Sequence, residues 1–463
     1  MNNQPPVMKL PATPPNPADI IGKLGTGSKG IERILQIAMA QFGPAPDHQY
    51  RHWDTLRHVE PPEGFTVEEW WLGIRMARQS LSRTLPIRDG NGQPFSFTMT
   101  DPGLYYLRFI DSQASGAIDS PKALLSQPER ERHIKRSLIE EAIQSSRLEG
   151  AATTHAVAKK MLTTERKPRD RSEQMILNNY NAMQFIGRIK HEALTPAMIL
   201  ELQRILTHDT LDDHSAAGRF RRPDEQITVV DRRDNEELHI PPDASELHER
   251  VKQLCNFANQ RDDLSPNAIY FHPVVRSILL HFWLAYDHPF VDGNGRTARA
   301  LFYWSMAHRG YWLCEYLTIS AILTKAPARY VQSFLYTETD NNDTTYFVLA
   351  QLGVIERAIH DLHRRLKQQS EATQQATAAL QQMNQVARLL NPRQIALLTH
   401  AMTHPNANYT IHTHMSAHGV TYLTARTDLL KLVGQGLLTK QKIGKLVYFM
   451  LPPDFPHQLL QLQ

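Results

Sequence analysis

Apolar residues recur at helical spacing on both sides of a short polar loop near residue 290. Before the loop, Val274, Ile278 and Phe282 stand four residues apart, and this spacing predicts a buried helix that ends at Asp287. Pro289 cannot continue such a helix, because proline lacks an N–H and its ring clashes with the preceding turn. We therefore expect a helix to end and a loop to begin at this point.

A second apolar pattern begins directly after the loop. Ala300, Leu301 and Trp304 give one apolar face to a predicted helix over residues 296–307. Gly310 then provides a natural C-terminal cap. The sequence thus predicts two helices joined by a loop of about eight residues.

Two further patterns lie upstream. Ile139, Ile143 and Leu148 predict another helix. Residues 227–230 are β-prone and are followed by a polar turn, a short return over residues 238–240 and a double proline, which predicts a hairpin. The central part of the chain is therefore expected to be helical with one short hairpin.

The N-terminal part changes character along its length. The first twenty residues are rich in proline, which is typical of an unstructured tail. From residue 31 to residue 118 the composition is globular, with a short strand expected at Phe95–Met99. A Gly-Asn-Gly turn at residues 90–92 has no comparable helix beside it, and we assign it no function. This part either docks on the core or recognises a partner.

The C-terminus has a pattern typical of a winged helix-turn-helix. Helices are predicted over residues 392–402, 413–418 and 422–433, and residues 437–451 alternate like a two-stranded wing. The polar and basic residues of the predicted recognition helix and wing are Thr421, Tyr422, Thr424, Arg426, Thr427, Lys431, Lys440, Lys442 and Lys445. Winged helices bind DNA through these two elements, and others serve as protein-docking or dimerisation modules. DNA, a protein partner and a homodimer all stay open.

These patterns divide the chain into five segments. They are a disordered tail (1–30), a mainly α N-terminal docking domain (31–125), an all-α core with a short β-hairpin (126–365), a Gln- and Ala-rich linker (366–390) and a C-terminal winged helix domain (391–463). Within the linker, residues 368–385 are low in apolar residues and are typical of either a solvated helix or an irregular linker. A chain of 463 residues is long enough for about three domains, each with its own core.

Composition narrows the function classes. The 51 basic and 47 acidic residues leave a formal charge of only +4, so any nucleic-acid binding must be local. Cys255 and Cys314 are too few for a disulfide framework and lack metal-ligand spacing, and we expect buried thiols. Neither a charged-then-apolar leader nor an apolar run of eighteen residues occurs in the sequence. We expect a cytoplasmic protein without a membrane partner.

The loop between the two predicted helices, HPFVDGNGRTAR from His288 to Arg299, holds the chemistry. His288 can take a proton from a hydroxyl near neutral pH. The turn at residues 293–295 and the N-terminus of the following helix can bind a phosphate. Arg296 and Arg299 lie on one helix face and suit a polyphosphate, and Asp292 can hold Mg²⁺ against it.

This loop resembles the signature of Fic domains, HPFx(D/E)GNGRxxR, at every specified position. The resemblance implies an all-α core that transfers AMP from ATP to a Ser, Thr or Tyr hydroxyl of a target protein or of the enzyme itself. It implies His288 as the base, Phe290 as the loop anchor and Asp292 as the Mg²⁺ ligand. The implied nucleotide-binding residues are Gly293, Asn294, Gly295, Arg296, Thr297, Ala298, Arg299 and Tyr330. Gly295 argues against the phosphorylating branch of the superfamily, which has lysine there.

A second resemblance lies in SSRLEG, residues 145–150, which matches the (S/T)xxxE(G/N) motif of the inhibitory helix in self-restrained Fic proteins. Ser145 and Glu149 are four residues apart and so share a helix face. The resemblance implies that Glu149 pairs with Arg299, which would otherwise hold the γ-phosphate. An ordinary surface glutamate is the alternative.

The predicted hairpin resembles the flap that lies over the Fic active site. The resemblance implies that a target segment pairs with Thr228, Val229 and Val230 as an added strand, whereas the alternative is a plain surface hairpin. Three other functions stay open: a DNA-binding regulator with a nucleotide-sensing core, transfer of another nucleotide, and removal of AMP by the same site. Of these, the regulator would not need His288.

Overall fold

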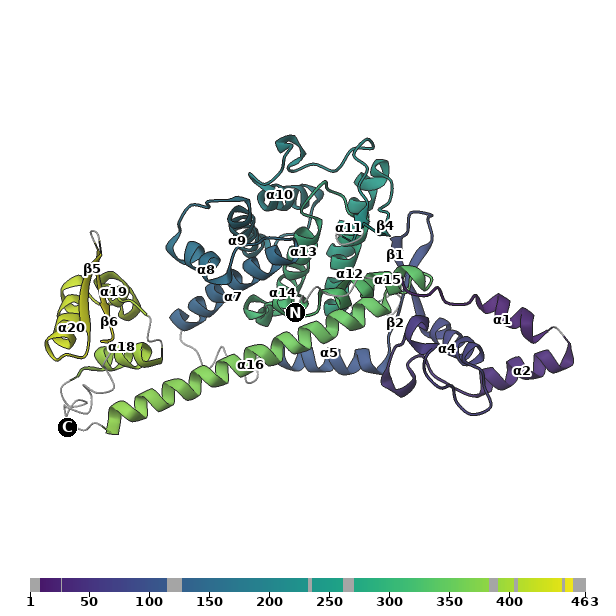
Figure 1. Ribbon diagram of the computed structural model, residues 1–463, viewed down its shortest axis with the longest axis horizontal. Helices are drawn as coiled ribbons and strands as arrows, with labels where there is room; N and C mark the ends of the chain where they lie inside the picture. Colours follow the sequence, from purple (N-terminus) through teal and green to yellow (C-terminus); the bar gives the residue numbers. More distant parts are fainter. Residues whose placement is uncertain are drawn as a thin grey trace. The chain divides into compact units, whose positions relative to one another are not determined.

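Helices make up most of this computed structural model (Figure 1), and the sheets among its described residues are three two-stranded antiparallel hairpins. The structure describes residues 9–25, 27–114, 127–231, 235–260, 270–382, 390–403, 407–443 and 446–452. The chain divides into two units, Met1–Ile359 and His360–Gln463. Each unit is treated by itself below.

The N-terminal part of the first unit packs around a cluster of apolar side chains. Its elements are α1 (Pro17–Leu24), α2 (Ser28–Met39), the 3-10 turn η1 (Pro46–His48), α3 (Trp53–Leu56), α4 (Val67–Leu81), β1 (Ser82–Arg88), β2 (Pro94–Thr98) and α5 (Asp101–Ala114). The buried members of the cluster are Ile20, Ile37, Leu56, Trp70, Trp71, Leu72 and Ile74. This part is therefore mainly helical, as predicted.

The predicted disordered tail over residues 1–30 is wrong for the stretch that forms α1 and the start of α2. Asn16 caps α1 by accepting a hydrogen bond from the N–H of Ala18 at 2.9 Å. Pro17 stands at the first helical position, where its missing N–H costs nothing. Ile20 is buried in the apolar cluster, so a proline-rich composition here conceals the start of a packed helix.

A hairpin and buried ion pairs hold this part against the core. The strand predicted at residues 95–99 is β2, and it pairs with β1, which was not predicted. The N–H of Ser96 donates to the carbonyl of Asn342 at 2.9 Å. Arg75 pairs with the buried Asp340 at 2.8 Å. The N-terminal part therefore contacts the core, while its role as a docking domain or as a partner-recognising domain stays a prediction.

The core is built around two helices that pack against each other, α12 (Pro273–Asp287) and α13 (Asn294–His308). The elements before them are α7 (Gln127–Leu148), α8 (His155–Thr164), α9 (Arg171–Ile189), α10 (Pro196–Thr207), η2 (His214–Ala216), β3 (Val229–Val230), β4 (Glu237–His239), η3 (Ala244–Glu246) and α11 (Leu247–Asn259). Those after them are η4 (Trp312–Tyr316), α14 (Ile319–Leu323), α15 (Pro327–Thr339) and α16 (Thr345–Gln382). Both helices next to the polar loop, and the hairpin β3–β4, appear where the sequence predicts them.

The predicted state of the two cysteines agrees with the structure. Cys255 and Cys314 are free thiols and both are buried, as expected. In the part of the chain that the structure describes, no helix is both long enough and apolar enough to cross a membrane.

The second unit begins within α16, which continues as a helix to Gln382. Of the two predicted alternatives for the Gln- and Ala-rich stretch, a helix or a linker, the structure agrees with a helix as far as Gln382. The remaining elements are α18 (Pro392–Thr403), α19 (Ile411–His418), α20 (Tyr422–Gly434), β5 (Thr439–Ile443) and β6 (Leu446–Met450).

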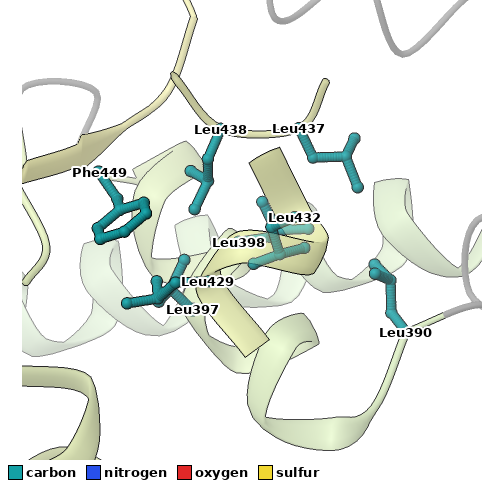
Figure 2. Close-up of a cluster of buried hydrophobic side chains, with 8 residues drawn as sticks. All are labelled: Leu390, Leu397, Leu398, Leu429, Leu432, Leu437, Leu438 and Phe449. Carbon is teal, nitrogen blue, oxygen red and sulfur yellow. The ribbon is translucent and has the colours of Figure 1, made fainter. Parts of the chain in front are cut away.

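Leucines from α18, α20 and the segment before β5 form the core of this second unit with Phe449 of β6 (Figure 2). Asp428 of α20 is buried, accepts a hydrogen bond from Asn391 at 2.7 Å and pairs with Arg393 at 2.8 Å. Three helices followed by a hairpin is the predicted order of elements, while the assignment as a winged helix domain stays a prediction.

Candidate functional site

His288 stands where α12 ends. Its backbone adopts the left-handed conformation, with φ 44°, and its N–H donates to the carbonyl of Leu284 at 3.2 Å. Nδ1 of the ring lies 3.3 Å from the carbonyl oxygen of Ala285. Because a carbonyl can only accept, this contact favours the tautomer with a proton on Nδ1. Nε2 is then the atom that can take a proton from a substrate.

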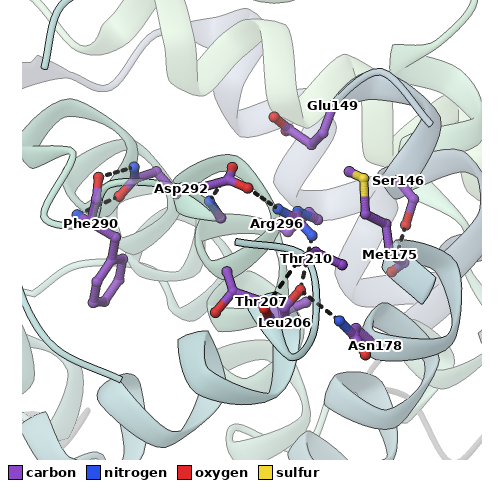
Figure 3. Close-up of polar contacts among 12 residues, drawn as sticks. Ser146, Glu149, Met175, Asn178, Leu206, Thr207, Thr210, Phe290, Asp292 and Arg296 are labelled. Atoms are coloured by element: carbon purple, nitrogen blue, oxygen red, sulfur yellow. Dashed lines mark hydrogen bonds and ion pairs between the residues drawn. The ribbon is translucent and has the colours of Figure 1, made fainter. Parts of the chain in front are cut away.

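The loop after His288 is closed by a reciprocal pair of hydrogen bonds. The N–H of Phe290 donates to Oδ1 of Asn294 at 2.9 Å, and Nδ2 of Asn294 donates to the carbonyl of Phe290 at 2.7 Å (Figure 3). The Phe290 ring is fully buried and packs on Phe220 with centroids 5.8 Å apart. Phe290 therefore anchors the loop in the core, as the resemblance implied.

Gly293 starts α13 with a φ of +89°, a conformation that disfavours other residues. The first N–H groups of any α-helix lack acceptors within the helix and carry a partial positive charge. The hydroxyl of Thr297 donates to the carbonyl of Gly293 at 2.8 Å, and Thr297 and Ala298 are fully buried. Thr297 and Ala298 thus lie in the first turns of α13 with buried side chains. Their role in nucleotide binding stays a prediction.

Asp292 and Arg296 lie side by side in the loop (Figure 3). Oδ2 of Asp292 is 3.1 Å from Nη2 of Arg296, and the aspartate side chain is 42% exposed whereas the arginine side chain is completely buried. Arg296 also donates to the carbonyl of Leu206 at 2.9 Å. Gln203 supports the loop from α10, since its Nε2 donates to the carbonyl of Asp292 at 3.1 Å. The Asp292 carboxylate is therefore accessible, whereas the Arg296 side chain is held in place by its contacts.

Arg299 joins the loop region to α7. Its Nε donates to the hydroxyl of Ser145 at 2.9 Å, and its Nη2 donates to the backbone carbonyl of Ser145 at 3.0 Å and to Oε1 of Glu149 at 2.8 Å. The arginine side chain is 2% exposed. The two upstream motif residues thus meet the loop arginine that the resemblance named, across more than 140 residues of sequence.

The four-residue spacing of Ser145 and Glu149 suggested that both lie on one helix, but Glu149 lies just outside it. α7 ends at Leu148, and Glu149 stands in the turn that follows, with Gly150 at a φ of +98°. A Cβ atom added to Gly295 would lie 2.2 Å from Oε1 of Glu149. The carboxylate therefore fills the space above the first turn of α13, and Gly295 leaves room for it.

The charges of the site follow from its burial. Burial alone would raise the pKa of Glu149, but the positive charges of Arg299 and Arg296 outweigh it and hold that pKa below its ordinary value. Burial lowers the pKa of His288 to about 4, so the imidazole is neutral at pH 7. The carboxylate is thus an anion held among cations, beside a base ready to accept a proton.

Tyr330 approaches the same arginine from α15. Its hydroxyl is 2.8 Å from Nε2 of His281 on α12. Burial raises the pKa of Tyr330 to about 12, against the charge of Arg299. The structure therefore brings this predicted residue close to the site, and its role toward a nucleotide stays a prediction.

The hairpin β3–β4 is attached to the site by two side chains that the sequence did not single out. Arg221 donates through Nε to the carbonyl of His288 at 3.0 Å and through Nη2 to the carbonyl of Pro242. His239 places Nδ1 2.8 Å from Oε2 of Glu338 and Nε2 2.7 Å from the carbonyl of Tyr286. A carbonyl only accepts, so Nε2 of His239 donates to Tyr286, and a second proton on Nδ1 would let the ring donate to the Glu338 carboxylate as well.

Consistent with that geometry, the pKa of His239 lies above its ordinary value, because the pairing with Glu338 outweighs the opposing effect of burial. Of the predicted flap residues, Val229 and Val230 form β3, with Val229 opposite His239, and Thr228 directly precedes the strand. No local signal identifies Arg221 or His239, because their partners are distant in the sequence.

The side chains around the loop show whether a Mg²⁺ ion could bind there. Among the described residues, no group of three or more His, Cys, Asp and Glu side chains is placed to hold a metal ion. Mg²⁺ bound with a nucleotide needs only one or two carboxylates, since phosphate oxygens and water supply its other ligands. The accessible carboxylate of Asp292 fits that more limited role.

Comparison with known proteins supports the resemblance found in the loop. Residues 193–306 match the model of the Fic/DOC family. The chain is 28% identical over 177 residues to a protein adenylyltransferase Fic of Nematostella vectensis, covering 37% of this chain and 38% of the relative. It is 29% identical over 290 residues to a protein adenylyltransferase Fic of Drosophila melanogaster, covering 60% of this chain and 53% of the relative.

The chain thus spans only about two fifths to one half of these curated relatives' length. Among solved structures, a Fic family protein from Desulfovibrio desulfuricans G20 is similar with a TM-score of 0.50 at 18% identity, covering 77% of this chain and 97% of that one. At that identity the likeness concerns the fold alone. Ser145, Glu149 and Tyr330 lie outside the residues that match the family model.

Proposed function

We propose that this protein transfers AMP from ATP to a Ser, Thr or Tyr hydroxyl of a target protein and of itself, and that Glu149 restrains the reaction. The observation that carries the proposal is the neutral His288 held beside the N-terminus of α13, with Arg299 paired to a carboxylate that stands where an anion would bind. The names of the similar adenylyltransferases agree with this chemistry.

The reaction follows from the placement of the groups. Nε2 of His288 accepts the proton of the attacking hydroxyl as its oxygen forms a bond to the α-phosphorus and the bond to the β-phosphate oxygen breaks. Pyrophosphate leaves. The free N–H groups of the first turn of α13, around Gly295, stabilise the charge that spreads over the α-phosphate oxygens. Arg299, once free of Glu149, is placed to hold the outer phosphates.

Asp292 would hold Mg²⁺ in this scheme, with phosphate oxygens and water as its other ligands. The ion would neutralise charge on the phosphates. Arg296 has the complementary task of fixing the Asp292 carboxylate, to which it donates at 3.1 Å. The Arg296 side chain is completely buried. In this scheme it therefore positions the carboxylate and does not contact a phosphate directly.

Restraint follows from competition for the same cations. A phosphate entering the turn at Gly295 meets the Glu149 carboxylate, whose oxygen lies 2.2 Å from the Cβ position of that glycine. ATP must then bind with its outer phosphates displaced, and its α-phosphate is no longer in line for attack. A misplacement of about 1 Å costs on the order of a hundredfold in rate.

The test is incorporation of label from ATP labelled at the α-phosphate, with ATP labelled at the γ-phosphate as the comparison. Transfer of AMP puts only the α-label on protein. His288→Ala should lower incorporation by about two to four orders of magnitude while nucleotide affinity changes little, because the imidazole acts on the hydroxyl. Incorporation of the γ-label, or a His288→Ala variant that keeps more than about a tenth of the activity, would contradict the proposal.

The same assay separates the related activities. α-Labelled ATP, GTP and UTP, compared at equal concentration, give the nucleotide preference. Release of labelled AMP from a modified protein after the nucleotide is removed would assign the reverse reaction to this site. A nucleotide sensor that regulates DNA would bind ATP and transfer no label.

We further propose that residues 391–463 form a winged helix domain that binds duplex DNA. Asp428 is the only carboxylate among the described residues 390–403, 407–443 and 446–452, and it is buried, whereas Arg426, Lys440 and Lys442 are exposed. Exposed cations without an exposed carboxylate among these described residues favour phosphates. Fluorescence anisotropy with labelled duplex DNA tests the proposal: Arg426→Ala should weaken binding, and binding should fall with rising salt. A dimer without DNA affinity would favour the docking alternative.

A further inference from the structure

We propose that a cavity of about 350 Å³ beside α15 binds a small planar aromatic anion. The cavity lies within the first unit, between the segment around Tyr50, α5, α15 and the start of α16. Its volume falls at the lower end of the range for small-molecule pockets. It contains none of the residues assigned above to the AMP-transferring site, so this inference does not rest on the proposed function.

The walls of the cavity are aromatic and fixed by hydrogen bonds. Tyr50, Tyr106, Tyr336 and Tyr346 all line it. The hydroxyl of Tyr50 donates to Asp343 at 2.5 Å and that of Tyr346 to Asp340 at 2.7 Å, while Tyr336 accepts from Gln332 at 2.9 Å. Arg78 already covers one face of the Tyr50 ring, and His52 stacks on one face of Tyr336. Rings held in place before a ligand arrives cost little to order, and another ring could stack on the faces that stay uncovered.

Polar groups without a protein partner complete the lining. Among the described residues, no hydrogen bond or ion pair engages the side chain of Gln49, the hydroxyl of Tyr106 or the guanidinium of Arg329. Each of these groups can donate a hydrogen bond. Gln49 and Arg329 are exposed and Tyr106 is half-buried, so all three groups are accessible to a ligand with acceptor atoms.

Charge decides the sign of the ligand. No carboxylate lines the cavity, and Arg329 is its only arginine or lysine. The two aspartates behind the tyrosine wall are offset by arginines, since Arg75 lies 2.8 Å and Arg78 3.6 Å from Asp340. Tyrosine faces alone would also attract a cation, but the free guanidinium repels one. Stacking surfaces together with one accessible arginine therefore select a flat ring that carries a carboxylate or a phosphate.

Two sources of this chemistry are distinguished by the probes. Isothermal titration calorimetry of the full chain would use indole-3-acetate as an aromatic carboxylate and AMP as an aromatic phosphate. Benzamidine, an aromatic cation, and inorganic phosphate are the controls. A ligand of this size with one ion pair should bind with a Kd of about 0.1 to 1 mM. Benzamidine should bind at least about tenfold more weakly, because Arg329 would repel it.

The variants place the binding in this cavity. Arg329→Gln should weaken the better of the two anionic probes by at least about tenfold, and Tyr106→Phe should weaken it by about threefold through loss of one hydroxyl. Arg329 is exposed, so its replacement should leave the melting temperature unchanged. Arg309→Gln is a control arginine outside the cavity. Absence of binding by both anionic probes up to about 5 mM, equal binding of benzamidine, or binding unaffected by Arg329→Gln would each overturn the proposal.

AMP requires one extra comparison, because the proposed AMP-transferring site could also take it. AMP binding is assigned to this cavity only where it is lost in Arg329→Gln and kept in Arg299→Ala. If AMP binding is lost in Arg299→Ala and kept in Arg329→Gln, the phosphate source is excluded and indole-3-acetate alone decides. Failure of both probes here would leave the labelling result at His288 unaffected, so the two proposals can fail separately.

Discussion

Replacing Glu149 with glycine should raise self-modification by about a hundredfold, because the change frees Arg299 and clears the space above Gly295. The carboxylate oxygen now lies 2.8 Å from Nη2 of Arg299 and 2.2 Å from the Cβ position of Gly295. An ATP phosphate cannot share that space. The measurement is incorporation of α-labelled ATP by wild type and variant at matched protein and Mg²⁺ concentrations.

The cost in stability should be small beside the gain in activity. Arg299 keeps its two hydrogen bonds to Ser145, at 2.9 and 3.0 Å, and the charge of Glu141 still acts on it. The variant therefore loses one charge-assisted hydrogen bond and does not leave a buried cation without any compensating charge. Such a bond contributes about 1.5 to 3 kcal/mol, which lowers the melting temperature of a large domain by a few degrees only. A gain in activity without global unfolding distinguishes release of restraint from loosening of the fold.

A double-mutant cycle with Arg299→Ala measures the coupling directly. Glu149→Gly combined with Arg299→Ala should lose most of the gain, since the freed arginine orients the outer phosphates. Glu140→Ala is the matched control: it removes a carboxylate from α7, the helix that precedes Glu149, where Glu140 contacts His155 at 2.7 Å. Equal labelling of wild type and Glu149→Gly would refute the reasoning, and the Glu149–Arg299 pair would then be structural only.

Four further expectations follow from the site. With the pKa of His288 lowered from 6.5 to about 4, the imidazole stays neutral as pH falls, so kcat/KM of Glu149→Gly should stay level from about pH 8 down to about pH 5; a loss centred at pH 6.5 would contradict this. His239→Gln should raise KM for a protein target severalfold and leave ATP affinity unchanged, because it removes the ion pair with Glu338 that fixes the hairpin; a change in ATP affinity alone would argue against a role in docking. Arg221→Ala should destabilise the fold by about 2 to 4 kcal/mol in urea unfolding, since it deprives the carbonyls of His288 and Pro242 of a buried donor; unchanged unfolding would mean that water replaces it. A chain ending at Gln382 should still bind ATP and label itself, because the second unit supplies none of the site residues; loss of ATP binding would show that the units depend on each other.

Local patterns predicted the elements that carry the site. The spacing of Val274, Ile278 and Phe282 located α12, and Pro289 located its end, because helix burial and proline geometry act over a few residues. The same reasoning failed at the N-terminus. There, one asparagine cap and one buried isoleucine decide between tail and helix, and composition averages over both.

Contacts between distant segments were beyond local patterns. Arg221 lies 67 residues from His288, and His239 lies 99 residues from Glu338. Each contact depends on how the hairpin packs on α12 and α15, which neither periodicity nor spacing expresses. The Glu149–Arg299 pair is equally distant, and only the family resemblance suggested it. Glu149 lies in the turn directly after α7, which ends at Leu148. This position, outside the predicted helix, is visible only in the fold.

The position of Glu149 links restraint and catalysis through one electrostatic field. Burial would raise the pKa of this carboxylate, but Arg299 and Arg296 hold that pKa below its ordinary value. In the proposed reaction the same cations and the N-terminus of α13 attract the phosphates of ATP, so the carboxylate would occupy the site as an anion in place of the nucleotide. A change that weakens the cations would therefore weaken restraint and nucleotide binding together. Only removal of the carboxylate itself separates the two effects, which is why Glu149, rather than either arginine, is the residue whose replacement can increase activity.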